Sequence, residues 1–555
     1  MTSFNWKIAG AAGEGIKKAG LIFAKTCFKH GLSVHGYTEY PSLIRGGHNT
    51  FQIHASSEDI FSPSFKLDLL VGLHEKSSQL HQDEITDKTI TLYDNLPLAK
   101  LVKQAGGTPQ MKNMVALGAS CFLLGLSLDK LNQTLAEIFA KKGQEIVQAN
   151  HQVSQAGYDY AQKNFKAKAK QPIPLKPEGK NKIFITGNQA LSYGAIAGGM
   201  KLYAAYPMTP ATSILHTLAA KAKPANIIVR HAEDEIGTAN MAIGAGFAGV
   251  RSMVATSGGG FSLMTEALGL SGITETPLVI VNAMRPGPAS GMPTWSSQGD
   301  LLYAIHASQD EFPRIVITPG DPQECFQLSK LAQNLAEKYQ LPIIILTDKY
   351  LGESYFTIDK PQPKHQNQRY GLADTKNLAN DQPFKRYQDT DTGVSPRSLP
   401  GQSGGVHLCN SYEHDELGYA TELAEERTKQ VNKRAKKTSQ ILKDPDFVNP
   451  ILYGPKNSQQ TLISWGSNKG IILEALKELK NTNFIHFPIV WPFPSHKFEQ
   501  LTQNSKKLIT LECNSTGQLN QLIQQQTCLK IENQILKYDG RPFFPEEIVE
   551  KLTSH

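Results

Sequence analysis

Closely spaced cysteines are the first feature that this sequence lacks. Its 555 residues include six cysteines, and no two of them form a CxxC pair. They are Cys27, Cys121, Cys325, Cys409, Cys513 and Cys528. Such wide spacing argues against a disulfide framework and against a zinc ribbon. It also argues against an iron–sulfur cluster held by this chain alone, because clusters are bound by neighbouring thiolates.

Long apolar runs are also missing. No stretch reaches the roughly 18–20 apolar residues that a membrane span requires. The N-terminus MTSFNWKIAG does not have the basic-then-apolar pattern of a secretory signal. We therefore expect a cytoplasmic protein with no membrane contact.

The positive charge of the chain is partly local. The net charge is +7, and part of the excess lies in the lysine-rich stretches 163–182 and 429–437. No aromatic stacking motif is interleaved with these lysines. We therefore interpret both stretches as solvated faces or linkers and expect no nucleic-acid partner.

The first part of the chain has the layout of a nucleotide-type α/β domain. Residues 1–165 open with a strand, FNWKIAG, which is followed by a glycine-containing turn and an amphipathic helix. The turn glycines Gly10, Gly13 and Gly15 fall short of a full GxGxxG motif. A tight turn that needs glycine for its backbone is therefore the simpler interpretation. A Lys/Pro-rich linker, 166–182, follows.

The rest of the chain predicts further α/β units. Residues 183–357, which begin inside the string KIFITG (182–187), alternate helices with Val/Ile/Leu-rich strands, which is typical of a parallel sheet covered on both faces. Residues 358–450 show little periodicity and one helix near 416–443, and 451–555 form a smaller alternating unit. The sequence thus predicts a multi-domain α/β fold built on parallel sheets.

Thr209, in the loop YPMTP, is the first candidate site residue. Pro207 and Pro210 stiffen this loop, because proline fixes φ. The hydroxyl of Thr209 could then donate to a substrate carboxylate or carbonyl. The alternative is an N-cap for the helix expected near Ala211.

An acidic cluster follows the strand-like NIIVRHA. Glu233, Asp234 and Glu235 stand at the end of this strand and open a run of small residues. Open α/β sheets bind ligands at the carboxyl ends of their strands, and a carboxylate among small apolar residues suits proton transfer. The alternative is an acidic helix start favoured by the helix dipole.

Two more turns of the same segment complete the candidate site. TSGGG (256–260), with Ser257 and Gly258, lies between a strand and a helix, where backbone amides can approach an anion or a flat cofactor. A tight turn is the alternative. Arg285 follows PLVIV in a Pro/Gly-rich loop and is placed to clamp a carboxylate, with a structural salt bridge as the alternative.

These strings resemble a known family. YPMTPAT, EDEIG, ATSGGG and VNAMRPGPASGMPTWSSQGDL are similar to the α subunit of 2-oxoacid:ferredoxin oxidoreductases, in the form with a γ domain fused in front. EYPSLIRGGHNTFQIH (39–54) resembles that γ domain, and TDKYLGES, NSYEHDELG, VWPFP and LECNSTGQL resemble further family signatures. The resemblance implies a γ-type domain at 1–165, a thiamine-diphosphate pyrimidine-binding domain at 183–357 and a transketolase C-terminal-like domain at 451–555.

The resemblance also implies a reaction. It assigns Glu235 to N1′ of the thiamine diphosphate aminopyrimidine. It assigns the other candidates to the cofactor (Pro207, Ser257 and Gly258) or to the substrate (Thr209 and Arg285). The reaction would convert a 2-oxoacid, with 2-oxoglutarate favoured, and CoA into acyl-CoA, CO₂ and reduced ferredoxin. Pyruvate or a broad 2-oxoacid range, or a non-catalytic scaffold subunit, are the alternatives.

Two family features are missing from the chain. It has no GDG motif for the diphosphate and no clustered cysteines. In split members of the family both lie on a β subunit, so we expect Mg²⁺ and the [4Fe–4S] cluster there and no metal on this chain. We expect a heterodimer, or a dimer of heterodimers, that is active only with β and reduces ferredoxin. The AAGEG turn is less glycine-rich than in the family, which leaves its ligand role open.

Overall fold

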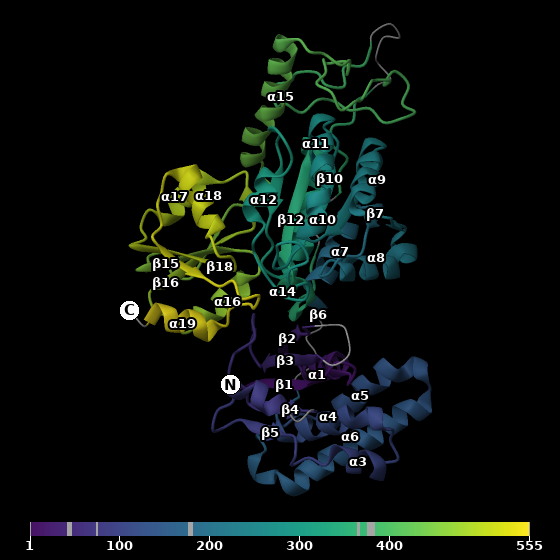
Figure 1. The fold of residues 1–555 in the computed structure, drawn as a ribbon, viewed down its shortest axis with the longest axis vertical. Coiled ribbons are helices and arrows are strands. Elements are labelled where there is room, and N and C mark those ends of the chain that lie inside the picture. The colour runs from purple at the N-terminus through teal and green to yellow at the C-terminus, as the bar shows by residue number, and fades with distance from the viewer. Residues whose placement is uncertain are drawn as a thin grey trace.

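The computed structural model describes residues 2–41, 47–73, 76–175, 181–362, 367–374 and 383–553. Residues 42–46 of the EYPSLIRGGHNTFQIH stretch and residues 176–180 of the expected linker lie outside these ranges. The described chain forms three sheets in an elongated molecule. In Figure 1 the N-terminal sheet lies at the lower end, the central sheet lies above it, and the C-terminal sheet lies beside the central one.

The N-terminal sheet is mixed, with the order β5-β4-β1-β3-β2-β13-β6. Its first five strands are β1 (Ser3–Ala11), β2 (Ser33–Glu39), β3 (His48–Ser56), β4 (Leu69–Gly72) and β5 (Ile90–Leu92). The larger helices of this unit are α1 (Ile16–Lys29), α3 (Leu98–Gln104), α4 (Lys112–Leu123), α5 (Leu128–Phe139) and α6 (Gln144–Asn164). In α1 the buried residues recur at three- and four-residue spacing, so one face of the helix packs into the core.

Two strands from the borders of the central unit extend this N-terminal sheet. β6 (Lys182–Thr186) pairs antiparallel with β13 (Tyr355–Asp359), and β13 pairs antiparallel with β2. The chain therefore enters the central unit through β6 and leaves it through β13. The expectation that KIFITG begins the central parallel sheet is wrong, because an apolar strand pattern does not show which sheet the strand joins.

The central sheet confirms the predicted parallel α/β fold, with the order β17-β11-β12-β10-β9-β7-β8. Its parallel strands are β7 (Leu202–Ala205), β8 (Ile228–His231), β9 (Ser252–Thr256), β10 (Leu278–Met284), β11 (Ile315–Ile317) and β12 (Pro342–Asp348). One apolar core includes α7 (Gly187–Ala197), α8 (Thr212–Ala225) and α13 (Pro322–Tyr339). The other includes α9 (Glu235–Phe247), α10 (Gly258–Leu263), α11 (Thr265–Ile273) and α12 (Leu301–His306). Helices thus cover both faces of the sheet.

The C-terminal unit is a smaller α/β sheet that docks on the central one. Its strands, in the order β14-β16-β15-β18-β19, are β14 (Ile451–Tyr453), β15 (Gln460–Trp465), β16 (Thr482–Phe487), β18 (Lys507–Glu512) and β19 (Asn533–Leu536). Its helices are α16 (Asn468–Ala475), α17 (Ser495–Thr502), α18 (Gln518–Thr527) and α19 (Pro545–Thr553). β17 (Ile489–Trp491), from the VWPFP stretch, instead pairs antiparallel with β11 and extends the central sheet.

Residues 383–423, which we call the arm, contain no helix and lie at the upper end of the molecule. α15 (Ala424–Leu442) follows the arm and begins later than the helix expected near 416–443. The reason is a turn at residues 415–419, where the amide of Asp415 donates to the carbonyl of Tyr419 at 3.0 Å. Across the described ranges, no helix combines the length and apolar character needed to cross a bilayer.

The basic run 429–437 is not the solvated face or linker that its composition indicated. It lies in α15, where Lys433 and Lys437 are buried and form ion pairs with Glu275 at 2.5 and 2.6 Å. Arg434 pairs with Glu413 of the arm at 2.8 Å. The expectation is wrong because the counter-ions come from distant parts of the chain, which a local charge pattern does not show.

Candidate functional site

The predicted site residues follow the carboxyl ends of four neighbouring parallel strands. Thr209 follows β7, Glu235 follows β8, Ser257 follows β9 and Arg285 follows β10. These strands are adjacent in the order β10-β9-β7-β8. Because the ends of parallel strands meet at one edge of a sheet, residues far apart in the sequence share that edge.

Glu235 is the first residue of α9 and is only 4% exposed. Its neighbour Asp234 occupies the N-cap position, where its side chain accepts a hydrogen bond from the amide of Gly237 at 2.7 Å. Glu233 is exposed. Asp234 therefore starts the helix, while Glu235 Oε1 is buried with no hydrogen-bond partner in the described chain. A buried carboxylate oxygen without a partner is costly, so this atom is an open acceptor for another molecule.

The glycine turn lies directly against Glu235. A Cβ on Gly260 would lie 2.6 Å from Glu235 Oε1 and 2.0 Å from Thr256 Oγ1, so no larger residue fits there. Ser257 is the N-cap residue of α10 and is fully buried, and its Oγ has no partner among the described residues. The turn thus adds a second buried polar atom that is open to a ligand.

Arg285 and Thr209, the two predicted substrate residues, are in contact. Arg285 Nη1 donates to the backbone carbonyl of Thr209 at 2.8 Å. Burial lowers the pKa of Arg285, and within the described ranges no carboxylate forms an ion pair with it. The N-cap of α8 is Ala211 and not Thr209. Neither the N-cap role of Thr209 nor the salt bridge of Arg285 therefore occurs among the described residues.

Pro207 and Gly258 lie on the two borders of this site. Pro207 is exposed in the loop after β7. Gly258 opens α10, and a Cβ there would lie 2.7 Å from Asp300 Oδ2. Glycine at this position lets the turn approach the Asp300 carboxylate closely.

Asn282 and Asp300 are residues of this edge that the sequence analysis missed. Asn282, in β10, donates through Nδ2 to Asp300 Oδ2 at 3.0 Å. Burial raises the pKa of Asp300. The signal that could have revealed the pair is the asparagine in LVIVNAM, because a polar side chain inside an apolar strand needs a buried partner.

A cavity of about 530 Å³ opens in the N-terminal unit beside its glycine turn. Gly13 and Gly15 have φ angles of +98° and +75°, which the backbone of other residues rarely adopts. The same turn lines the cavity together with Lys18, Lys112 and Lys142. The turn conformation alone therefore explains both glycines, and the three ammonium groups near the start of α1 also suit an anionic ligand.

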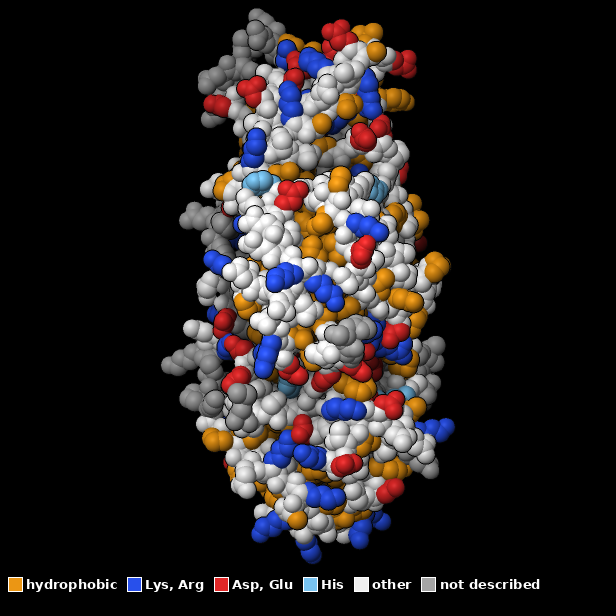
Figure 2. Space-filling view, turned by 90° about the vertical axis from the view of Figure 1, so that its left-hand side faces the viewer, with side chains coloured by type: hydrophobic (Ala, Val, Ile, Leu, Met, Phe, Trp, Pro, Cys, Tyr) orange, Lys and Arg blue, Asp and Glu red, His pale blue; other side chains and the backbone are white. Residues whose placement is uncertain are grey.

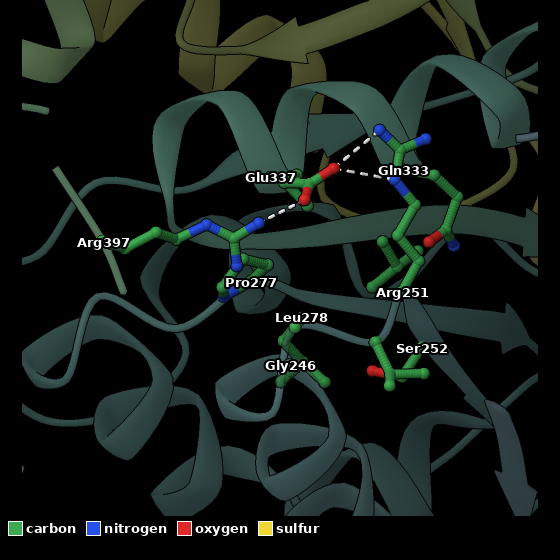
Figure 3. A pocket seen from close by; sticks show the side chains of 12 residues that line it. Gly246, Arg251, Ser252, Pro277, Leu278, Gln333, Glu337 and Arg397 are labelled. Carbon is green, nitrogen blue, oxygen red and sulfur yellow. Dashed lines mark hydrogen bonds and ion pairs between the residues drawn. The ribbon is translucent and has the colours of Figure 1, made fainter. Parts of the chain in front are cut away.

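A much smaller cavity, of about 10 Å³, lies away from the site and has room for one water molecule. Figure 3 shows Arg251 and Arg397 on either side of Glu337, which lies on α13. Arg251 Nη2 lies 2.7 Å from a carboxylate oxygen of Glu337, and Arg397 pairs with the other oxygen. This cluster fastens the arm to the central unit, and we assign it a structural role.

Comparisons with known proteins show the family of this chain. Residues 193–433 match the family described as pyruvate flavodoxin/ferredoxin oxidoreductase, thiamine diP-bdg, and residues 5–160 match pyruvate ferredoxin/flavodoxin oxidoreductase. The 2-oxoacid:ferredoxin oxidoreductase subunit alpha of Saccharolobus solfataricus is 32% identical over 99% of this chain and 97% of that protein. The 2-oxoglutarate oxidoreductase subunit KorA of Mycobacterium tuberculosis is 28% identical over 98% and 90%, respectively.

A solved structure matches along its whole length. The 2-oxoglutarate:ferredoxin oxidoreductase from Magnetococcus marinus, with 2-oxoglutarate, coenzyme A and succinyl-CoA bound, has a TM-score of 0.93 at 30% identity, covering 100% of this chain and 99% of that chain. The fold and the site thus define an oxidoreductase subunit with a thiamine-diphosphate-binding domain. The chain belongs to the alpha subunits of the 2-oxoacid:ferredoxin oxidoreductases.

Proposed function

We propose that this chain is the catalytic α subunit of a 2-oxoglutarate:ferredoxin oxidoreductase that works only with a β subunit. The observation that carries the proposal is the open acceptor of buried Glu235, at the sheet edge that also presents Thr209 and Arg285. In the reaction the C1–C2 bond of the 2-oxoacid breaks and CO₂ leaves. Two electrons pass singly to two ferredoxins, and the acyl carbon bonds to the sulfur of CoA, whose thiol proton is released.

The residues present fit the pyrimidine end of thiamine diphosphate. When bound, the cofactor supplies the electron sink that decarboxylation of a 2-oxoacid requires. Glu235 Oε1 is an open acceptor in a buried setting, so it can hold a proton shared with the ring nitrogen N1′ while water is excluded. We assign the lining of the cofactor to Pro207, which follows β7, and to Ser257 and Gly258, which follow the neighbouring strand β9.

Arg285 and Thr209 bind and orient the substrate in this proposal. The Arg285 guanidinium keeps donors beyond the one that contacts the Thr209 carbonyl, and these suit the carboxylate of a 2-oxoacid. The choice of 2-oxoglutarate is supported by the Magnetococcus marinus enzyme, which was solved with that substrate bound. Pyruvate or a broad 2-oxoacid range is the alternative.

In this proposal the diphosphate, the electrons and CoA are bound outside the central sheet edge. A β subunit supplies Mg²⁺, the diphosphate site and the [4Fe–4S] cluster, because the six cysteines of this chain are far apart in sequence. CoA fits the lysine-lined cavity of the N-terminal unit, where Lys18, Lys112 and Lys142 can meet its phosphates.

The test is a Glu235→Gln variant assayed together with its β subunit, with Glu233→Gln as the matched control two residues away. Glutamine keeps the shape of glutamate but cannot exchange a proton, so turnover of 2-oxoglutarate should fall by about 10²–10⁴-fold. Thermal unfolding and binding of β should stay unchanged. The exposed Glu233 should tolerate the same change. Near-normal turnover of Glu235→Gln would contradict the proposal, and a wild-type complex that converts no 2-oxoacid would support the scaffold alternative.

A further inference from the structure

The arm exposes large apolar side chains that the proposed chemistry does not use. Their exposure ranges from 47% to 86%. They are Val406, Leu408, Tyr412, Tyr419 and Leu423, which we call the arm patch. Figure 2 shows apolar side chains among acidic and basic ones at this upper end of the molecule. Exposed apolar groups that gather in one place mark interaction surfaces.

One side-chain and one backbone hydrogen bond fold the arm around members of the patch. Asn410 Nδ2 donates to the carbonyl of Gly418 at 2.7 Å. The amide of Thr421 donates to the carbonyl of Glu413 at 2.9 Å. These bonds place residues 408–413 alongside 418–421, so that Leu408, Tyr412 and Tyr419 belong to one folded segment, 408–421.

Ion pairs with α15 also hold the segment 408–421 in place. Glu413 pairs with Arg427 at 2.5 Å and with Arg434 at 2.8 Å, and both arginines belong to α15. His414, which forms an isolated antiparallel bridge with Ala420, is buried. A surface that is already ordered loses little conformational entropy when a partner binds. The exposed tyrosines and leucines are therefore presented in a form that suits docking.

The arm patch continues into the open face of α9. Phe247 is partly exposed near the end of α9, and its ring centroid lies 5.8 Å from that of His407, between Val406 and Leu408. Ile236 and Met241 are each 48% exposed on the same helix. Exposed apolar side chains thus occur along α9 from its first turn, beside Glu235, to its end against the arm. In Figure 1 the loops of the arm lie above α9 at the upper end of the molecule.

We infer that the arm patch docks the β subunit that completes the thiamine diphosphate site. This inference rests on the proposed function. A subunit that holds the diphosphate of a cofactor whose pyrimidine meets Glu235 must lie near the first turn of α9, and the exposed apolar side chains of α9 lead from there to the arm. A second copy of this chain would bring another Glu235 and not the missing diphosphate half. The β subunit therefore meets both the helix and the arm patch.

The experiment measures binding of isolated β subunit to the full chain by calorimetry. Tyr412→Ser and Leu408→Ser change the arm patch. Tyr538→Ser is the matched control, because Tyr538 and Tyr412 are each 71% exposed and Tyr538 lies in the C-terminal unit. We expect each arm variant to raise the Kd by at least about 10-fold, the effect of losing an anchor residue. The control should bind as the wild type does, and all three should keep the wild-type melting temperature.

The outcomes separate this inference from the proposed function. Equal affinity of wild type and both arm variants for β overturns the inference alone, since Glu235→Gln tests the chemistry independently. Self-association of the chain that the arm variants abolish, with affinity for β unchanged, would assign the patch to a second copy and also overturn the inference. Failure of the wild-type chain to bind β overturns both proposals.

Discussion

Two buried glutamates of the central unit have opposite surroundings. Glu275, just after α11, is fully buried, and its carboxylate lies 2.5 Å from Lys433 Nζ and 2.6 Å from Lys437 Nζ. Burial would raise the pKa of Glu275, but the charges of the two lysines outweigh burial and hold this pKa well below its usual range. Glu235 is almost as buried, yet its Oε1 has no partner in the described chain.

The difference separates residues that complete the fold from residues that await another molecule. Burying a charge is costly unless a partner compensates for it. The partners of Glu275 are Lys433 and Lys437 of α15 in the same chain, and these ion pairs also hold α15 against the central unit. Glu235 Oε1 has no such partner among the described residues, and it lies at a sheet edge where ligands of open α/β folds bind. We therefore expect substitutions of Glu275 to change stability and substitutions of Glu235 to change turnover.

The largest expected effect on stability follows from Glu275→Gln. The change leaves Lys433 and Lys437 buried without their counter-ion, so we expect the free energy of unfolding in urea to fall by about 3–5 kcal/mol. Glu422→Gln, at an exposed position near the end of the arm, is the control and should stay within about 0.5 kcal/mol of wild type. If Glu275→Gln were no less stable than this control, the ion pairs would not be what holds α15.

The contrast also explains what the sequence could reveal. The central parallel sheet was predictable because its strands are continuous Val/Ile/Leu runs, and the position of Glu235 after a strand was visible in NIIVRHAEDEIG. The pairing of Glu275 was not predictable, because Lys433 and Lys437 lie far along the chain in a run that looks solvated. Local patterns report burial on one element, whereas a buried ion pair depends on which elements the fold brings together.

The same limit applies to the sheets and to the site. KIFITG has an apolar strand pattern, but only its pairing with β13 places it in the N-terminal sheet. Asn282 stands out in its strand, but its partner Asp300 lies in a loop with no pattern of its own. The turns that present Thr209 and Arg285 were predictable one at a time, and their contact required the strand order.

Arg285→Lys tests the other half of this contrast, namely that residues at the Glu235 sheet edge affect turnover and not stability. Lysine keeps the positive charge but loses the planar fork that contacts the Thr209 carbonyl and suits a carboxylate. We expect kcat/KM for the 2-oxoacid to fall by about 10–100-fold, which corresponds to about 1.4–2.7 kcal/mol of transition-state binding. Steady-state kinetics of the complex with β measure this effect. Unfolding in urea should not change, in contrast to Glu275→Gln, and a loss of stability without a change in kcat/KM would assign Arg285 to the structure.

The smallest expected effect is the pH dependence of the free energy of unfolding that Lys437, beside Glu275, contributes. Burial lowers the pKa of Lys437 to about 8, and the nearby Glu275 opposes this shift only in part. The ordinary pKa of lysine is about 10.4, so between about pH 8 and pH 10.4 the unfolded chain binds more protons at this residue than the folded chain does. Stability contributed by this residue should therefore rise with pH across that window.

Urea unfolding of wild type and Lys437→Met between pH 7.5 and pH 10.5, roughly the window set by these two pKa values, should show that the variant lacks this rise. Lys436→Met, one position away on the half-buried side of α15, should retain it. Parallel curves for wild type and Lys437→Met would mean that Glu275 holds Lys437 charged throughout the window, so that both lysines complete the Glu275 site as full counter-ions.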